Sequence, residues 1–247
     1  MRTFTEAGLL PFGSSFVQEF SLVGETGDSI PAANVMGMVT GQSNSEMSIV
    51  ISAHFDHLGI RNGRVYNGAD DNASGTAALL ELARIIAQSP LQHNVIFLAT
   101  DAEERGMLGA QAFIANPPIS LDRIALNVNM DMVSHSDSVL YAAGTYRYPA
   151  LRPFLETVNH RADIVLRFGH DDPALGPDDD WTNSSDHAPF NDSGIPFVYF
   201  GVEDHEDYHR PTDDFSTINA AFYEKAVETI LDALQELDHN LEAINRQ

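Results

Sequence analysis

Short apolar runs alternate with helix-like segments along most of this chain, and that alternation most limits the folds it can adopt. The runs at 94–100 and 124–130 are largely apolar, which is typical of strands buried on both faces. Segment 76–88 instead repeats its apolar residues at helical spacing. Strands that alternate with helices predict an α/β fold, with a mixed, mostly parallel central sheet and helices on both of its faces.

The remaining segments extend this pattern. Further strands are expected at 34–40, 48–53, 138–142, 164–167 and 195–200, the first two joined by a turn at 41–46 and the third adjacent to 124–130. Further helices are expected at 107–115, 148–160 and 218–241. We treat residues 1–247 as one domain, in which 1–33 lead into the sheet. Segment 169–191, rich in Asp, Pro, Gly and Asn, is expected to be a loop over the functional site.

The charge of the chain excludes several kinds of partner. Its 36 Asp and Glu against 13 Lys and Arg give a formal net charge of -23, and Lys225 is the only lysine. Such a surface repels phosphate backbones and anionic lipids, so neither nucleic acid nor a membrane is expected as a partner. The absence of cysteine excludes disulfides, thiolate nucleophiles and Cys-ligated zinc. No apolar run is long enough to span a membrane, and no leader peptide is visible at the N-terminus.

Unusual polar residues follow the ends of the predicted strands. They form five clusters, at 54–57, 67–75, 101–104, 129–132 and 207–213. Ligands of α/β proteins bind outside the carboxyl ends of the strands. We therefore expect these His, Asp and Glu side chains to converge on one site.

The donor types in these clusters indicate divalent metal ions. Imidazole and carboxylate without thiolate suit zinc, manganese or cobalt. Two histidines and three or four carboxylates exceed the needs of one zinc and suit two metals that share a bridging carboxylate. In an extended chain Asp56 lies on the same side as His54, where it can accept the second N–H of that ring. Glu103 and Glu104 point differently, so one can bind metal while the other acts as a general base.

In the order and content of these stretches the chain resembles the family 28 metallopeptidases, which include dizinc aminopeptidases and carboxypeptidase relatives. The resemblance is carried by SAHFDHLG (52–59), NGADDNASG (67–75), DAEERGMLG (101–109), NMDM (129–132), SSDHAPFNDSGIP (184–196) and DYHRPTDD (207–214). It implies two zinc ions per chain, for which cobalt or manganese could substitute. The implied ligands are His54 and Asp131 for one ion, Glu104 and His209 for the other, and Asp70 as the bridge.

The resemblance also implies catalytic roles. Glu103 would be the general base, and Asp56 would orient His54. Tyr208 is the first choice for the group that stabilises the oxyanion, and His187 is the second. The peptide bond after the bridging aspartate is often cis in this family, so the bond after Asp70 is expected to be cis.

The function implied is a zinc-dependent exopeptidase, most simply an aminopeptidase acting on peptides with a free N-terminus. Three alternatives stay open: a glutaminyl cyclase-like enzyme with one zinc, a dizinc carboxypeptidase, and a non-catalytic binding domain. A carboxypeptidase would need arginines to hold a carboxylate, and the motifs contain only Arg105 and Arg210. Many relatives are exported, so a secreted or periplasmic location is the expectation. The oligomeric state is open.

Other polar residues are given simpler interpretations. Residues 205–209 match the H-E-x-x-H pattern, which binds zinc only on a helix. Because Gly201 and Pro211 flank this polar segment, we predict a loop in which His205 and Glu206 are exposed. The remaining histidines are expected to be solvated, apart from His57, which has either a packing role or one beside the metal ligands. Five aspartates could line a cleft and attract a cationic N-terminus, but we expect them to be solvated: Asp171, Asp172, Asp178, Asp179 and Asp180. Trp181 either walls a substrate pocket or packs the loop down.

Overall fold

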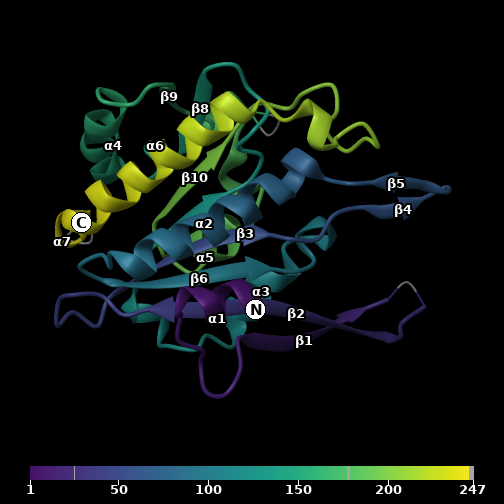
Figure 1. The fold of residues 1–247 in the computed structure, drawn as a ribbon, viewed down its shortest axis with the longest axis horizontal. Coiled ribbons are helices and arrows are strands. Elements are labelled where there is room, and N and C mark those ends of the chain that lie inside the picture. The colour runs from purple at the N-terminus through teal and green to yellow at the C-terminus, as the bar shows by residue number, and fades with distance from the viewer. Residues whose placement is uncertain (25, 177–178, 245–247) are drawn as a thin grey trace.

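The computed structural model describes residues 1–24, 26–176 and 179–244, which form one large sheet with helices on both faces (Figure 1). The strands from one edge of the sheet to the other are β1 (Val17–Val23), β2 (Ser29–Val39), β6 (Asn94–Thr100), β3 (Ser48–His54), β7 (Ile124–Met130), β10 (Phe197–Gly201), β8 (Val139–Ala143) and β9 (Val165–Phe168). A separate ribbon of β4 (Gly59–Arg61) and β5 (Arg64–Tyr66) projects from the body of the molecule.

The four central strands β6, β3, β7 and β10 pair in parallel, while β1, β2 and β8 join by antiparallel pairing and β9 runs parallel to β8. The predicted mixed, mostly parallel sheet is thus confirmed. Two predicted pairs of neighbouring strands are wrong. β6 lies between β2 and β3, and β10 lies between β7 and β8. Strand order depends on contacts between distant segments, which local patterning does not encode.

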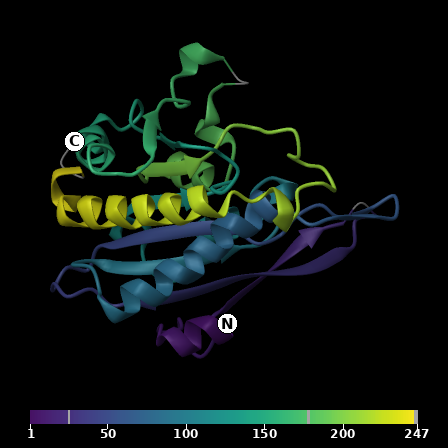
Figure 2. The same ribbon diagram turned by 45° about the horizontal axis from the view of Figure 1, so that its top comes forward.

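The helices divide between the two faces of the sheet. They are α1 (Arg2–Ala7), α2 (Gly75–Gln88), α3 (Leu108–Ala115), α4 (Arg152–Asn159), α5 (His187–Asp192), α6 (Ala220–His239) and α7 (Leu241–Ile244). Helices α2 and α6 run side by side across one face (Figure 2). Phe113 of α3 and Phe190 of α5 belong to the core of the other face.

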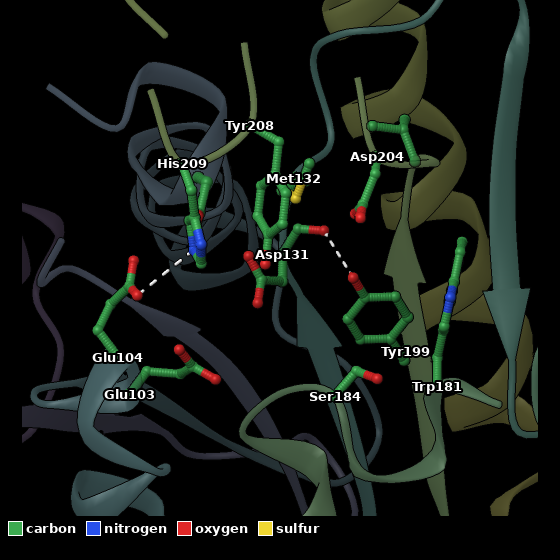
Figure 3. Close-up of a pocket in the computed structure, with 12 residues that line it drawn as sticks. Glu103, Glu104, Asp131, Met132, Trp181, Ser184, Tyr199, Asp204, Tyr208 and His209 are labelled. Atoms are coloured by element: carbon green, nitrogen blue, oxygen red, sulfur yellow. Dashed lines mark hydrogen bonds and ion pairs between the residues drawn. The ribbon is translucent and has the colours of Figure 1, made fainter. Parts of the chain in front are cut away.

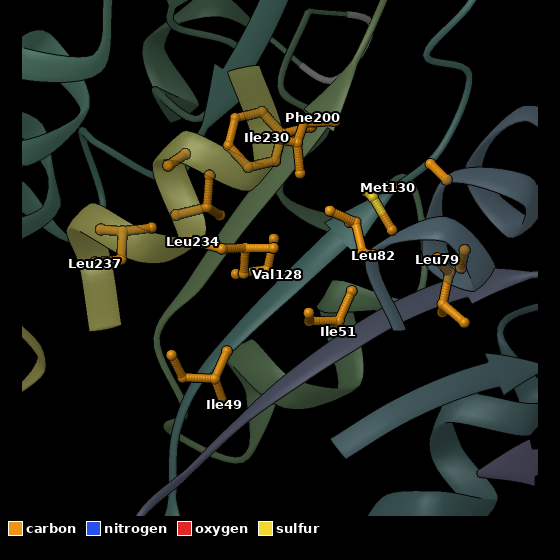
Figure 4. Close-up of a cluster of buried hydrophobic side chains, with 14 of the residues drawn as sticks. Ile49, Ile51, Leu79, Leu82, Val128, Met130, Phe200, Ile230, Leu234 and Leu237 are labelled. Atoms are coloured by element: carbon orange, nitrogen blue, oxygen red, sulfur yellow. The ribbon is translucent and has the colours of Figure 1, made fainter. Parts of the chain in front are cut away.

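Alternating residues of the central strands build the two cores. Ile49 and Ile51 of β3 pack with Leu79, Leu82 and Leu234 beneath α2 and α6 (Figure 4). The residue between these two isoleucines, Val50, belongs to the core under α3 and α5. Both sides of the strand are therefore buried, as the uniformly apolar runs predict.

Most element boundaries agree with the sequence to within a few residues. The main difference among the helices is at 148–160, where α4 begins only at Arg152. Two prolines, Pro149 and Pro153, lie at the start of this segment, and the chain first forms a short 3₁₀ turn at Pro149–Leu151. The lead-in at 1–33 also contains α1 and the edge strand β1, neither of which was predicted. Among the helices of the described ranges, none combines the length and the apolar character that a membrane span requires.

The parallel pairing brings the ends of the central strands to one edge of the sheet. His54 ends β3 and Asp131 directly follows β7. Helix α2 begins close by, because Gly75 lies where an added Cβ would stand 2.4 Å from the carbonyl oxygen of Met130. The small residue lets the preceding segment, Ala69–Ser74, sit against the strand ends.

Candidate active site

One group of metal-binding side chains lies at the ends of β3 and β7. Nε2 of His54 is 3.2 Å from Oδ1 of Asp131 and 3.3 Å from Oδ1 of Asp71. One donor atom from each of these three buried residues lies within 4.8 Å of the other two. The three side chains could therefore hold a single metal ion.

A second group shares Asp71 with the first. Nε2 of His209 is 3.1 Å from Oδ2 of Asp71 and 3.4 Å from Oε2 of Glu104. His57 completes the group, with Nδ1 2.8 Å from Oε1 of Glu104. Because Asp71 belongs to both groups, its two carboxylate oxygens could bridge two metals.

The structure corrects the predicted bridging residue. Asp70 points away from both groups: its Oδ1 accepts hydrogen bonds from the backbone N and Oγ of Ser134, and its Oδ2 lies 3.1 Å from His205. The cis peptide bond is also one residue later than predicted, between Asp71 and Asn72. Two adjacent aspartates differ only in the direction of their side chains, and no feature of a single sequence distinguishes them.

Asp56 supports the site in a different way from the one predicted. Nδ1 of His54 contacts the backbone oxygen of Asp56 at 3.0 Å, whereas the carboxylate accepts hydrogen bonds from the backbone amides of Glu103 and Glu104 at 2.9 and 3.3 Å. A proton on Nδ1 leaves the Nε2 lone pair of His54 free for a metal. Asp56 thus fixes the imidazole through its carbonyl group and positions the two glutamates through its side chain.

Further hydrogen bonds hold the carboxylates in place. Asp213 accepts from the amides of Asp70 and Asp71 at 2.9 and 3.1 Å. Ser185 donates to Oδ2 of Asp131 at 2.6 Å. Tyr199 donates to the backbone oxygen of Asp131 at 3.1 Å. The supporting roles of Ser185 and Tyr199 were missed, although Ser185 lies within one of the matching stretches.

Glu103 occupies a position suited to proton transfer. Its Oε2 is 4.0 Å from Nε2 of His54, and its side chain is 15% exposed. Burial, with the nearby negative charge of Asp131, raises the pKa of Glu103 to about 9. The neighbouring glutamate behaves differently: burial opposes its ionisation, but hydrogen bonds from His209 and His57 outweigh that effect and lower the pKa of Glu104 to about 2.

The same environment favours positive charge. Burial opposes protonation of His54, but Asp131 raises its pKa well above the usual value. Hydrogen bonds to Asp71 and Glu104 raise the pKa of His209 to about 10. Carboxylates that converge on His54 and His209 and raise their pKa make a site that divalent cations would satisfy, and the imidazole and carboxylate donors fit zinc.

Most of the donor side chains, together with Glu103, lie on the wall of a cavity of about 340 Å³ (Figure 3), whereas His54 and His57 are not among its lining residues. Its described lining residues are Asp71, Glu103, Glu104, Asp131, Met132, Trp181, Ser184, Tyr199, Val202, Asp204, Tyr208 and His209. Trp181 also stacks on His170 at a ring separation of 3.7 Å, so it both walls the cavity and anchors its loop. Five carboxylates and no Lys or Arg appear among these described lining residues.

The two candidates for the oxyanion group have different surroundings. Tyr208 lines the cavity and stacks on His209 at 3.9 Å. His187 is fully buried, and its Nε2 lies 2.8 Å from the backbone oxygen of Trp181. Burial lowers the pKa of His187 to about 4. The structure therefore makes His187 a packing residue behind the cavity wall, and the suggested oxyanion role for it is wrong.

Several simpler interpretations can also be compared with the structure. Residues 205–209 form no helix, and Glu206 is exposed, as predicted. His205 is not exposed, because it reaches the buried Asp70. His93 was expected to be solvated, yet it is buried against Asp238 at 2.9 Å.

The loop at 169–191 also contains a buried aspartate. Asp171 is fully buried and accepts hydrogen bonds from the backbone amides of Tyr146 and Arg147 at 2.7 and 2.9 Å. The expectation that the loop aspartates are solvated is therefore wrong for Asp171. Asp178 lies outside the described residues. The end of the segment also differs from a loop, because α5 begins at His187.

The chain is similar to known aminopeptidases over most of its own length. The chain is 28% identical over 219 residues to Aminopeptidase YwaD of Bacillus subtilis, a match that covers 82% of this chain and 44% of the relative. A solved zinc aminopeptidase from Bacillus subtilis matches 83% of this chain and 50% of its own, with a TM-score of 0.67 and 26% identity. The chain thus spans about half the length of these relatives.

A third comparison concerns the fold alone. A glutaminyl cyclase from Bacteroides thetaiotaomicron matches 95% of this chain and 86% of its own with a TM-score of 0.73, at 19% identity.

The model of Peptidase family M28 matches residues 34–234, a span that includes every side chain of the two donor groups. The chain belongs to peptidase family M28.

Proposed function

We propose that this chain is the catalytic domain of a metal-dependent aminopeptidase that removes N-terminal residues from peptides. The observation that carries the proposal is the position of Asp71, which two groups of donor atoms share on the wall of an acidic cavity. Relatives that include an aminopeptidase and a zinc aminopeptidase support this assignment.

The donor atoms suggest how two zinc ions would be held. His54, Asp71 and Asp131 would bind one ion, while Asp71 and Glu104 would bind the other together with the imidazoles of His57 and His209. Two bound divalent ions would supply Lewis acidity, which lowers the pKa of water and polarises a carbonyl group. Cobalt or manganese would suit the same donors.

The chain's own residues then have separate tasks. Divalent ions beside Glu103 would lower its pKa and so favour the ionised carboxylate. In that form Glu103 would accept a proton from the attacking water molecule and return it to the leaving amine. The carboxylate of Asp56 holds Glu103 and Glu104 in place by accepting hydrogen bonds from their backbone amides. Tyr208 is the cavity side chain that we assign to the developing oxyanion, because its ring stacks on His209 beside the donor groups.

The charges around the cavity favour a free N-terminus over a free C-terminus. Asp204 lines the cavity and is not assigned to metal or to proton transfer, so its carboxylate can attract an ammonium group, whereas a carboxypeptidase needs a cationic side chain for the substrate carboxylate. Arg105 and Arg210 are both exposed, and neither is among the described lining residues. The acidic lining therefore supports aminopeptidase activity over carboxypeptidase activity.

The test uses a panel of aminoacyl-nitroanilides, each with its N-acetylated counterpart as the control. We expect release of nitroaniline from the free amines alone, its loss on treatment with a chelator, and its recovery when zinc is restored. A glutaminyl peptide assayed by mass spectrometry separates the cyclase alternative. Loss of ammonia from this peptide without cleavage of any nitroanilide would overturn the proposal in favour of a cyclase.

A further inference from the structure

A third group of donor atoms lies behind Asp71 and has no part in the function proposed above. It consists of Asp70, His135 and His205, whose donor atoms lie within 4.8 Å of one another. Oδ2 of Asp70 is 3.1 Å from Nε2 of His205, and the ring centres of His135 and His205 are 3.8 Å apart, with the rings tilted at 30° to each other. The geometry points to a third metal site, which takes zinc and ties together the segments that carry the catalytic ligands.

The spacing of the donors suits zinc. Ligand atoms on a tetrahedral zinc, at ~2.0–2.1 Å from the ion, stand about 3.3 Å from one another. The 3.1 Å separation between Asp70 and His205 already matches this value. Two histidines and one carboxylate also form the ligand set of zinc sites that keep a fourth position for water.

The burial of the group argues against simple solvation. The side chain of Asp70 is fully buried and that of His205 is 9% exposed. Nδ1 of His135 is buried as well, and no hydrogen-bond partner for it lies among the described residues. A buried polar nitrogen without a partner is costly, and a bound cation would satisfy it.

Zinc binding would change the position of the proton on the His205 ring. Nδ1 of His205 now accepts a contact from the backbone amide of Asp207 at 3.3 Å. Zinc on Nε2 would place the remaining proton on Nδ1, so this long contact would be lost. The hydrogen bonds from Ser134 to the other oxygen of Asp70 would be retained, which leaves Oδ2 free for the metal.

The position of the group gives it a structural purpose. Asp70 precedes Asp71, His135 follows Asp131 by four residues, and His205 precedes His209 by four residues. Each ligand of the third site therefore comes from a segment that supplies one of the two donor groups at the cavity. A metal here would fix the relative positions of these three segments without touching the cavity.

The experiment counts zinc per chain by inductively coupled plasma mass spectrometry after equilibration in zinc-buffered solution. His135→Ala and His205→Ala are compared with the wild-type chain and with His160→Ala, a matched control because His160 is exposed at the end of α4. We expect both test variants to hold one zinc fewer than the wild-type chain and the control. Equal zinc content in all four proteins would overturn the third site.

A second measurement does not depend on the folding of the variants. Cobalt is titrated into the metal-free wild-type chain and its d–d absorption is followed to saturation. Three tightly bound equivalents support the site, and two overturn it while leaving the proposed catalytic pair intact. The comparison of zinc content between His135→Ala and His160→Ala does not depend on turnover. It therefore tests the third site even if the proposed catalytic activity is absent.

Discussion

The side chains of the adjacent residues Asp70 and Asp71 point into different parts of the molecule. Asp71 lines the cavity with four further carboxylates and contacts His54 and His209, while Asp70 faces inward to Ser134 and two histidines. Both sides combine imidazole with carboxylate, yet only the cavity side lies in reach of a substrate. Metal-binding side chains alone thus do not define an active site, which also requires access for the substrate and a general base.

The largest predicted effect separates these two residues directly. Asp71→Asn removes the carboxylate that both donor groups share, so we expect loss of the metal pair and at least a ~10⁴-fold fall in kcat/KM for an aminoacyl-nitroanilide, since metal activation contributes several kcal/mol. Asp70→Asn is the matched control and should keep the metal pair with a smaller loss of turnover. A larger loss for Asp70→Asn than for Asp71→Asn would reverse the assignment.

The next prediction separates metal binding from proton transfer within the cavity. Glu103→Gln keeps the shape of the side chain but cannot accept a proton, so kcat should fall ~10²–10⁴-fold with metal content unchanged. Turnover and metal content are measured on the same sample, with the exposed Glu206→Gln as the control. Unchanged turnover in Glu103→Gln would remove Glu103 from the mechanism.

A smaller effect, on metal affinity, is expected from Ser185, which lies behind the metal ligands. Ser185 donates a 2.6 Å hydrogen bond to Asp131 and accepts one from Asn129. Ser185→Ala should weaken metal binding ~10–100-fold, as loss of such supporting contacts does elsewhere. Competition with a chelator measures the affinity, and Ser193→Ala on the exposed end of α5 should leave it unchanged. Equal affinities in the two variants would show that Ser185 does not support the site.

The smallest effect concerns stability and tests the buried position of His187. Its pKa is lowered to about 4 by burial, so the unfolded chain binds a proton below about pH 6.5 that the folded chain does not. Stability from this residue is therefore lost as pH falls from 6.5 toward 4, by about 2 kcal/mol between pH 7.5 and pH 5. In His187→Gln, urea unfolding should show a shallower decline than the wild-type chain, and an identical decline would place the ring in solvent.

The sequence predicted the central strands and the polar clusters well, because strands buried on both faces produce continuous apolar runs. The ends of β6 and β7 agree with the predicted ones to the residue. The clusters after the strands were expected to converge, and His54, Glu104, Asp131 and His209 do lie together. Parallel pairing places successive strand ends at one edge, so the convergence follows from the fold class.

Other features could not be predicted for physical reasons. The directions of Asp70 and Asp71 depend on the irregular backbone of Ala69–Ser74, where two residues depart from helical angles. The burial of His205 and Asp171 depends on partners far away in the sequence. Local composition indicates that such residues are polar, but only the packed structure shows what they contact.

The central claim is that Asp71 bridges two metal ions at the cavity. Crystals of the zinc-loaded protein, measured on both sides of the zinc absorption edge, locate each ion by anomalous scattering. The account predicts two peaks in contact with the Asp71 carboxylate, one beside His54 and Asp131 and the other beside Glu104 and His209. A single peak at the cavity, or a pair that does not touch Asp71, would contradict it.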